Sequence, residues 1–327
     1  YVIAVSNGTD ALRLSLYLAG VKPNDEVIMP PLTFVATANA VAHLGASPHF
    51  VDIEPQSLGI SPNALQKRLD EVSIIKNGQV FNRFSGNRIA AVVPVHVFGL
   101  PSKIEEIKSI CLNWNLPLIE DAAEALGSRV NKLDKKIHCG CFGEISTLSF
   151  NGNKIITTGG GGAILTNNEL HAKRAKHLSS TAKISHPWRF YHDQIGWNDR
   201  LPNINAALGS SQIEKLEEKI IQKRILHSKY KNIFEDLKEL EIISESKNTE
   251  SNYWLVTLRL LCKNPEKIRK KILQDAHESK IFIRPSWDLL NQLPMYKKSP
   301  SGELKEAINQ SNRLINLPSS PQLIKNI

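Results

Sequence analysis

Short apolar runs alternate with helix-like patterns through the first two-thirds of the chain. Runs rich in β-branched residues predict strands at Glu26–Met29, Pro48–Ile53, Ile89–Val95, Pro117–Glu120, Ser146–Phe150 and Gly162–Thr166. Apolar positions three and four residues apart predict helices at Thr9–Ala19, Thr33–His43, Ser102–Asn113 and Glu169–Leu178. The polar stretch Val72–Asn87 predicts a loop insertion or an irregular hairpin. This alternation is typical of an α/β domain with a mostly parallel sheet.

The pattern changes after Trp197. From Asn203 to about Leu240, apolar positions spaced among charged residues predict a long amphipathic helix with at most one break. A strand, a helix and a second strand are then predicted at Tyr253–Leu261, Pro265–Ser279 and Ile281–Pro285. We therefore expect two domains, a large α/β domain over residues 1–205 and a smaller α+β domain over residues 206–327.

Composition and charge limit the classes of partner. The 327 residues carry 41 Lys and Arg against 32 Asp and Glu, which gives a formal net charge of +9. The basic residues are interspersed with acidic ones, as between Glu214 and Arg224, and form no basic stripe with aromatic residues. We therefore expect a solvated surface and no nucleic-acid partner, although a mildly positive field also suits a nucleotide-linked substrate. Because no apolar run reaches about 18 residues, we expect no membrane partner.

The cysteines suggest a cytoplasmic protein. Cys111, Cys139, Cys141 and Cys262 have the spacing of neither a zinc site nor a redox pair, so we expect free thiols in a reducing compartment and no metal. A metal bound near Cys139 is the weaker alternative. No signal peptide opens the chain. The first residues are apolar, as in the middle of a fold, and the last ones predict no clear helix, so we expect native segments to be missing at both ends.

Two stretches near the N-terminus could hold a planar ligand that carries a phosphate. Ser6–Asp10 precedes a predicted helix, and Gly8 allows a tight turn there. Free amide groups at a helix start bind phosphate, but the same residues also suit a plain helix cap. Phe34 follows the predicted strand Glu26–Met29 at the sheet edge where ligand sites of α/β proteins lie. Its ring could stack on a cofactor or could belong to the core.

Two later stretches place ionisable side chains at strand ends. Asp121 ends the apolar run that begins at Pro117, where its carboxylate could pair with a protonated ring nitrogen or cap a helix. Lys154 follows the strand Ser146–Phe150 and precedes the glycines Gly159–Gly162. A lysine presented by such a turn can act as a nucleophile toward aldehydes. A nucleotide P-loop has the reverse order of glycines and lysine, and no G-x-G-x-x-G joins a strand to a helix.

The order and spacing of these motifs resemble the DegT/DnrJ/StrS family of sugar aminotransferases, which are pyridoxal phosphate (PLP) enzymes of fold type I. The likeness extends from Val5 to about Gln212 and, more weakly, to Pro321. It implies a large PLP-binding domain with a mostly parallel sheet and a smaller C-terminal α+β domain. Relatives have a further stretch of chain before the position of Tyr1.

The resemblance assigns roles in the cofactor site by position. Lys154 would carry PLP as a Schiff base, and Asp121 would face the nitrogen of the pyridine ring. Phe34 would stack on that ring. Glu124 stands where relatives often have Gln or His, which leaves its role in the site open.

The resemblance also assigns the phosphate site and a homodimer. Ser149 would bind the phosphate together with Gly8 and Thr9. The Gly-x-Asn-x-Arg motif falls on Gly196–Arg200, and in the family its asparagine, here Asn198, reaches the phosphate of the neighbouring subunit. The implied assembly is therefore a homodimer with shared active sites.

The implied reaction moves an amino group from an amino acid, expected to be glutamate, to C4 of a nucleotide-linked 4-keto-6-deoxy sugar. Asn7, the glycine run and the segments Arg284–Trp287 and Leu293–Tyr296 further resemble the branch that aminates a UDP-linked N-acetylhexosamine. That branch supplies bacillosamine and legionaminic acid synthesis, and so surface polysaccharide or glycan precursors.

Three other functions stay open at this stage. A PLP- or pyridoxamine phosphate-dependent sugar dehydratase is disfavoured because several such relatives replace the lysine with histidine. An inactive relative that regulates or binds sugars is disfavoured by the intact Lys154, Asp121 and Ser149. An NAD-dependent sugar enzyme would need the dinucleotide motif that this chain lacks.

Overall fold

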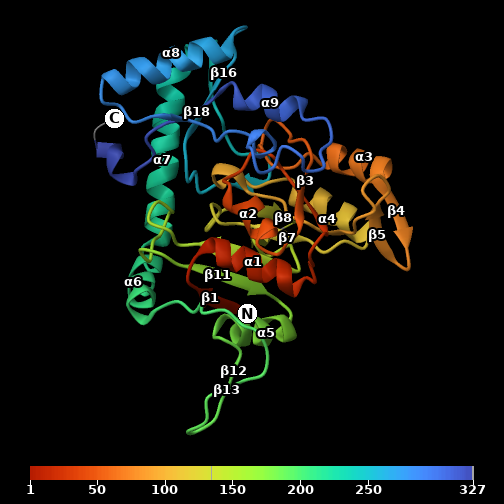
Figure 1. Ribbon diagram of the computed structural model, residues 1–327. Coiled ribbons are helices and arrows are strands. Elements are labelled where there is room, and N and C mark those ends of the chain that lie inside the picture. The colour runs from red at the N-terminus through yellow and green to blue at the C-terminus, as the bar shows by residue number, and fades with distance from the viewer. Residues whose placement is uncertain (134, 326–327) are drawn as a thin grey trace.

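The computed structural model describes residues 1–133 and 135–325 and contains a central sheet covered by helices on both faces (Figure 1). Two hydrogen-bonded groups of strands have the orders β1-β11-β10-β7 and β3-β2-β6. Bridges from Val92 to Leu118 and from Val95 to Asp121 join β6 to β7. Among the strands of these two groups, β11 alone is antiparallel to its neighbours. The predicted α/β class with a mostly parallel sheet is therefore confirmed.

The strands of this sheet are β1 (Val2–Val5), β2 (Glu26–Met29), β3 (Ser47–Phe50), β6 (Ile89–Val92), β7 (Ile119–Asp121), β10 (Ile145–Ser149) and β11 (Gly162–Thr166). The helices are α1 (Gly8–Leu18), α2 (Ala36–Ala42) and α5 (Glu169–Ser179) on one face, with α3 (Pro62–Val72) and α4 (Ile104–Asn113) on the other. Val27 and Met29 pack into the first core and Ile28 into the second, because successive side chains of a strand point to opposite faces. The sheet is thus buried on both sides.

The C-terminal part has its own small sheet. Its strands, in the order β14-β16-β18-β17, are β14 (Leu240–Ile242), β16 (Thr257–Leu260), β18 (Leu314–Asn316) and β17 (Arg284–Pro285). The helices α7 (Leu216–Phe234) and α8 (Pro265–Glu278) pack on its core, whereas α9 (Lys305–Ser311) contributes Ala307 to the core of the large sheet. The predicted boundary after residue 205 falls inside α6 (Asn203–Ile213), and Tyr253 and Trp254 pack into the core of the large sheet. The division into two domains stays a prediction.

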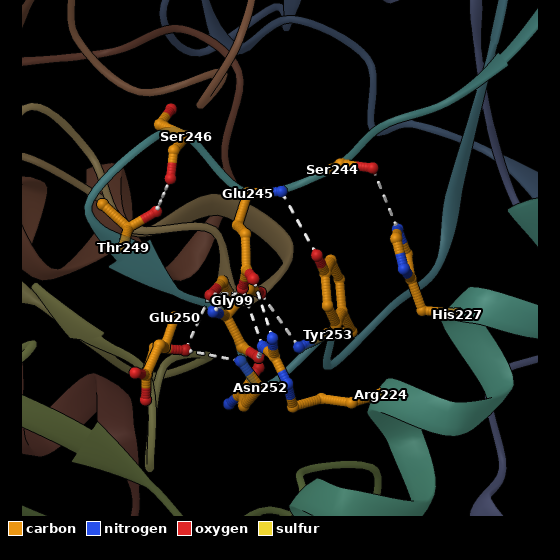
Figure 2. A network of polar contacts seen from close by, with 12 residues as sticks. Gly99, Arg224, His227, Ser244, Glu245, Ser246, Thr249, Glu250, Asn252 and Tyr253 are labelled. Atoms are coloured by element: carbon orange, nitrogen blue, oxygen red, sulfur yellow. Dashed lines mark hydrogen bonds and ion pairs between the residues drawn. The ribbon is translucent and has the colours of Figure 1, made fainter.

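The connection between the two parts is a dense polar network (Figure 2). Arg224 of α7 donates to both carboxylate oxygens of Glu245 at 2.7 Å and to the carbonyl of Ser251 at 2.8 Å. The ring of Tyr253 stacks on His227, and its hydroxyl accepts from the amide of Glu245. The residues before β16 are therefore fixed against α7, and the predicted strand from Tyr253 begins only at Thr257.

Several predicted elements have the observed bounds and others were missed. The strands Glu26–Met29 and Gly162–Thr166 match, and the polar stretch after Val72 forms the hairpin β4 (Ser73–Lys76) and β5 (Gln79–Asn82). The predicted long helix is broken after Ile213 into α6 and α7. The elements that were not predicted are α3, α9, β8 (Arg129–Lys132), β9 (Lys135–His138), β12 (Lys183–Ile184), β13 (Tyr191–His192), β14, β15 (Thr249–Glu250), β18 and three short 3-10 turns at Val97–Gly99, Leu290–Gln292 and Pro321–Lys325.

Two further observations bear on expectations from the sequence. No helix within the described residues is long and apolar enough to cross a membrane. The cysteines are free thiols, and the His138 ring nitrogen beside Cys139 accepts a hydrogen bond from the amide of Gly127 at 2.6 Å. Within the described part of the chain, no cluster of three or more His, Cys, Asp or Glu residues could hold a metal ion.

Candidate active site

A cavity of about 290 Å³ opens at the carboxyl ends of β7 and β10 and at the start of α1. Seven residues singled out from the sequence lie in its wall: Gly8, Thr9, Phe34, Asp121, Glu124, Ser149 and Lys154. A larger hollow of about 530 Å³ lies at the opposite ends of β6 and β7 and contains none of the seven. Because ligands of open α/β sheets bind at the carboxyl ends of the strands, we regard the first cavity as the candidate active site.

Lys154 is presented by a tight turn after β10. The turn is closed by hydrogen bonds from Lys154 N–H to the Asn151 carbonyl and from Thr158 N–H to the Phe150 carbonyl, both at 3.0 Å. The lysine Nζ lies 3.3 Å from Oε1 of Glu124 and 3.9 Å from the ring centre of Trp254. Only 11% of the lysine side chain is exposed, so its amine is held against these two partners inside the cavity.

Asp121 ends β7 with its carboxylate in the cavity wall. Oδ2 accepts from the hydroxyl of Thr37 at 2.8 Å, and Oδ1 accepts from the amide of Ala123 at 3.2 Å. The first hydrogen bond ties the carboxylate to α2. The second closes a local turn, and no helix begins among the described residues between β7 and β8, so the helix-capping alternative for Asp121 is wrong. Both interactions hold the carboxylate in the cavity wall, where an oxygen could accept a hydrogen bond from a protonated ring nitrogen.

The start of α1 lies directly against the end of β10. Asn7 caps the helix by accepting from the amide of Asp10, so the capping alternative for this stretch is correct for Asn7. A Cβ at Gly8 would lie only 2.8 Å from Cβ of Ser149, so the glycine allows this close approach. The first amide groups of a helix have no partner within it, and here they stand beside the Ser149 hydroxyl. This corner of the cavity offers donors to an anion.

An aromatic wall lies on another side of the cavity. Phe34 is 51% exposed, so the alternative that it belongs to the core is wrong. Its ring centre lies 6.2 Å from that of Trp287, which in turn lies 4.9 Å from that of Phe98. The exposed face of Phe34 in the cavity can stack on a planar ring.

We expect Gly162→Ala to loosen this site. A Cβ at this position would lie 2.6 Å from the backbone carbon of Asn7 and 2.8 Å from the amide nitrogen of Gly8, and backbone atoms cannot move aside cheaply. The free energy of unfolding should fall by about 1–3 kcal/mol, as for other overpacked sites, and cofactor retention measured by equilibrium dialysis should weaken. Gly152→Ala is the matched control because its Cβ would meet no atom within 4 Å. Equal retention in both variants would contradict this account of the turn.

Two residues of the site were missed from the sequence. Trp254 lines the cavity, lies over Lys154 and donates from its indole N–H to the Asn153 carbonyl at 2.7 Å. Thr37 holds Asp121. The signal that could have found Thr37 is its place in the same stretch as Phe34. No local pattern marked Trp254, which the sequence placed in a predicted strand.

Asn198 does not line this cavity. It is exposed and forms an isolated β-bridge with Ser180. The two residues lie at the base of the arm formed by β12 and β13, which projects from the body of the molecule below α5 (Figure 1). Arg200 is also exposed and bridges to Val5. The role that the resemblance gives to Asn198, in the site of a neighbouring subunit, stays a prediction.

Comparisons with known proteins agree with this geometry. The model of the DegT/DnrJ/EryC1/StrS aminotransferase family matches residues 1–326. GDP-perosamine synthase of Escherichia coli O157:H7 is 35% identical over 324 residues, which cover 99% of this chain and 81% of the relative. The dTDP-4-dehydro-2,3,6-trideoxy-D-glucose 4-aminotransferase of Saccharopolyspora spinosa is 30% identical over 337 residues, 98% of this chain and 80% of the relative. A crystal structure of NtdA from Bacillus subtilis with bound pyridoxamine phosphate superposes with a TM-score of 0.81 at 27% identity. The match covers 98% of this chain and 69% of NtdA.

Proposed function

Because the chain belongs to the DegT/DnrJ/EryC1/StrS aminotransferase family, we propose that it transfers an amino group from glutamate to C4 of a UDP-linked 4-keto-6-deoxy-N-acetylhexosamine. Family membership makes the chain a PLP-dependent sugar aminotransferase. One observation carries the narrower proposal: Asn7, Arg284 and Trp287, which resemble the UDP-sugar branch, lie in the wall of the cavity that contains Lys154. The product would serve surface polysaccharide or glycan precursor synthesis.

The residues around Lys154 fit PLP. The start of α1 and the Ser149 hydroxyl offer donors for a phosphate, in a cradle that a Cβ at Gly8 would fill. Phe34 offers a ring face, and Asp121 offers an acceptor for a protonated ring nitrogen. When bound, PLP supplies an aldehyde that condenses with amines and a ring that withdraws electrons from the carbon beside the amine.

The protein's own groups would position substrate and move protons. Lys154 Nζ would take the proton from Cα of the donor as a general base and would then deliver it, as a general acid, to the carbon that carried the cofactor aldehyde. Asp121 holds a proton on the ring nitrogen. Trp254 is almost fully buried beside the amine and keeps water from it. Arg284 lines the cavity, and we assign it to an anionic group of a substrate, either the donor carboxylate or a phosphate.

A direct substrate comparison tests the proposal. The holoenzyme is supplied with L-glutamate and either UDP-4-keto-6-deoxy-N-acetylglucosamine or GDP-4-keto-6-deoxymannose, and the products are identified by mass spectrometry. We expect an aminated UDP-sugar and a preference in kcat/KM of at least about tenfold over the GDP-sugar. A product that has lost water instead of gaining an amino group would support a dehydratase.

A GDP-linked sugar is the second candidate substrate. The specific observation in its favour is the 35% identity to GDP-perosamine synthase over nearly the whole chain. Amination of the GDP-sugar alone in the same comparison would replace the first proposal with this one.

We also propose that the active protein is a homodimer with shared sites. No residue of α6 is buried, and its apolar Ile204, Leu208 and Ile213 face solvent in the single chain. The arm carries the exposed aromatic residues Trp188 and Phe190. Exposed apolar side chains of this kind support burial of α6 and the arm against a partner subunit. Both elements lie next to the exposed Asn198.

Complementation between two inactive variants tests the shared site. We expect Asn198→Ala and Lys154→Ala each to be inactive as homodimers, because each removes a different residue from every site. Co-expression should restore about a quarter of native activity, since half of randomly paired dimers are mixed and each mixed dimer has one intact site. A fully active Asn198→Ala variant, or co-expressed chains with no activity, would contradict the shared site.

A further inference from the structure

Glu124 is a buried carboxylate in the active site whose role the sequence leaves open. Its side chain is 5% exposed, and its Oε1 lies 3.3 Å from Nζ of Lys154. Oε2 accepts a hydrogen bond from the amide of Phe98 at 2.8 Å. One oxygen is therefore fixed to the protein backbone, and the other is directed at the amine that performs the chemistry.

The backbone that carries Glu124 is held in place. Asn252, which is fully buried, donates from Nδ2 to the carbonyls of Glu124 and Leu126, both at 2.9 Å. Its own Oδ1 accepts from the amide of Trp254 at 2.8 Å. The same amide side chain thus fixes both Glu124 and Trp254, which are the two partners of the lysine amine.

The turn that supplies the Phe98 amide has a strained backbone and is held by hydrogen bonds. Phe98 has a φ of 57° and Gly99 a φ of 89°, which is the left-handed region that a non-glycine residue avoids. The Gly99 carbonyl accepts from the hydroxyls of Ser128 at 2.7 Å and Ser251 at 2.9 Å, next to the network of Asn252 (Figure 2). Strain that is maintained by such contacts is characteristic of functional sites, and here it aims an N–H at Glu124.

The charged groups that face Glu124 are Lys154 and Asp121. Burial raises the pKa of Glu124, and the nearby Asp121 raises it further, whereas Lys154 and the Phe98 amide oppose the rise. The carboxylate can therefore accept a proton closer to neutrality than an exposed glutamate can.

We propose that Glu124 is a catalytic acid–base residue that exchanges the amino-group proton of the donor. The amino group of glutamate arrives as an ammonium and must lose a proton before its nitrogen can attack. That N–H bond breaks, its electron pair stays on nitrogen, and the proton bonds to Oε1 of Glu124 while Oε2 keeps the Phe98 hydrogen bond. The proton returns to the amino nitrogen at the end of the half-reaction, so none is consumed. This role rests on the proposed aminotransferase function.

The first test is the glutamate half-reaction of the holoenzyme, followed by stopped-flow visible absorbance over a series of pH values. In the native protein the rate should rise with pH as Glu124 loses its proton, because only the carboxylate can accept one. Glu124→Gln keeps the shape and an acceptor for the Phe98 amide but cannot take the proton. We therefore expect its rate to be lower by about 10²-fold or more and not to rise with pH. Glu124→Asp should keep the pH dependence at an intermediate rate. The exposed Glu144→Gln is the control and should behave as native.

A second readout does not depend on turnover. Infrared difference spectroscopy of the protein without cofactor should show a buried carboxylic acid that titrates in the native chain and in Glu144→Gln but is missing in Glu124→Gln. A native-like rate and pH profile in Glu124→Gln would overturn the proposal, and so would the absence of the titrating carboxyl. If the native holoenzyme does not react with glutamate at any pH, the aminotransferase function or its donor fails, and the infrared titration still decides the protonation of Glu124.

Discussion

Replacing Lys154 with alanine should abolish both covalent attachment of the cofactor and transamination. Nζ is the only lysine amine that lines the candidate cavity within the described residues, so no neighbour can take its place. The variant loses the nucleophile and the general base at once, and we expect turnover to fall by at least about 10⁴-fold. The measurement is single-turnover conversion of glutamate to its keto acid, together with mass spectrometry after borohydride reduction, which should find no cofactor on the peptide containing position 154.

Lys154→Arg is the matched variant. It keeps a cation between Glu124 and the ring of Trp254, so the fold and the buried carboxylate should be preserved. It cannot form the covalent linkage, and we expect it to be as inactive as the alanine variant. Reduction that still traps cofactor on another lysine, with activity near the native value, would show that Lys154 has been assigned wrongly.

Asp121→Asn should cause the second largest loss. The amide keeps an acceptor for the Thr37 hydroxyl but carries no charge to hold a proton on the cofactor ring. The ring then withdraws electrons poorly, and we expect kcat to fall by about 10²–10³-fold, as when one preorganised electrostatic contact is removed from an active site. The measurement is kcat for the glutamate half-reaction with the cofactor saturating.

Thr37→Val distinguishes the effect of the Asp121 charge from the effect of the hydrogen bond that positions it. It removes the 2.8 Å hydrogen bond to Asp121 and leaves the carboxylate in place, so the loss should be about tenfold or less. An Asp121→Asn variant that is no slower than Thr37→Val would contradict the role of the charge.

The sequence predicted those parts of the fold whose signal is local. β2 and β11 are apolar runs bounded by turn residues, and their observed bounds match the prediction. The arm of β12 and β13 was missed because its strands are short and exposed, with no buried side to create a pattern. The pair β8 and β15 was missed because strands far apart in the sequence make that pairing. Local periodicity carries no information about such contacts.

The candidate site was predictable to the extent that its residues lie in motifs. Asp121, Ser149 and Lys154 stand at strand ends, and the parallel topology brings those ends to one edge. Trp254 was missed because its place over Lys154 depends on Asn252 and on contacts with turns more than a hundred residues earlier in the chain. No local pattern showed which arginine reaches the cavity, and of Arg200 and Arg284 the fold brings only Arg284 there.

The most direct test of the account is the visible absorption spectrum of the purified protein with PLP, recorded before and after L-glutamate is added. We predict a yellow band from PLP bound to Lys154 that bleaches toward the spectrum of pyridoxamine phosphate when glutamate is added. A band that forms and does not respond to glutamate would contradict glutamate as the donor. The absence of any band that depends on Lys154 would contradict the central claim that this lysine holds the cofactor.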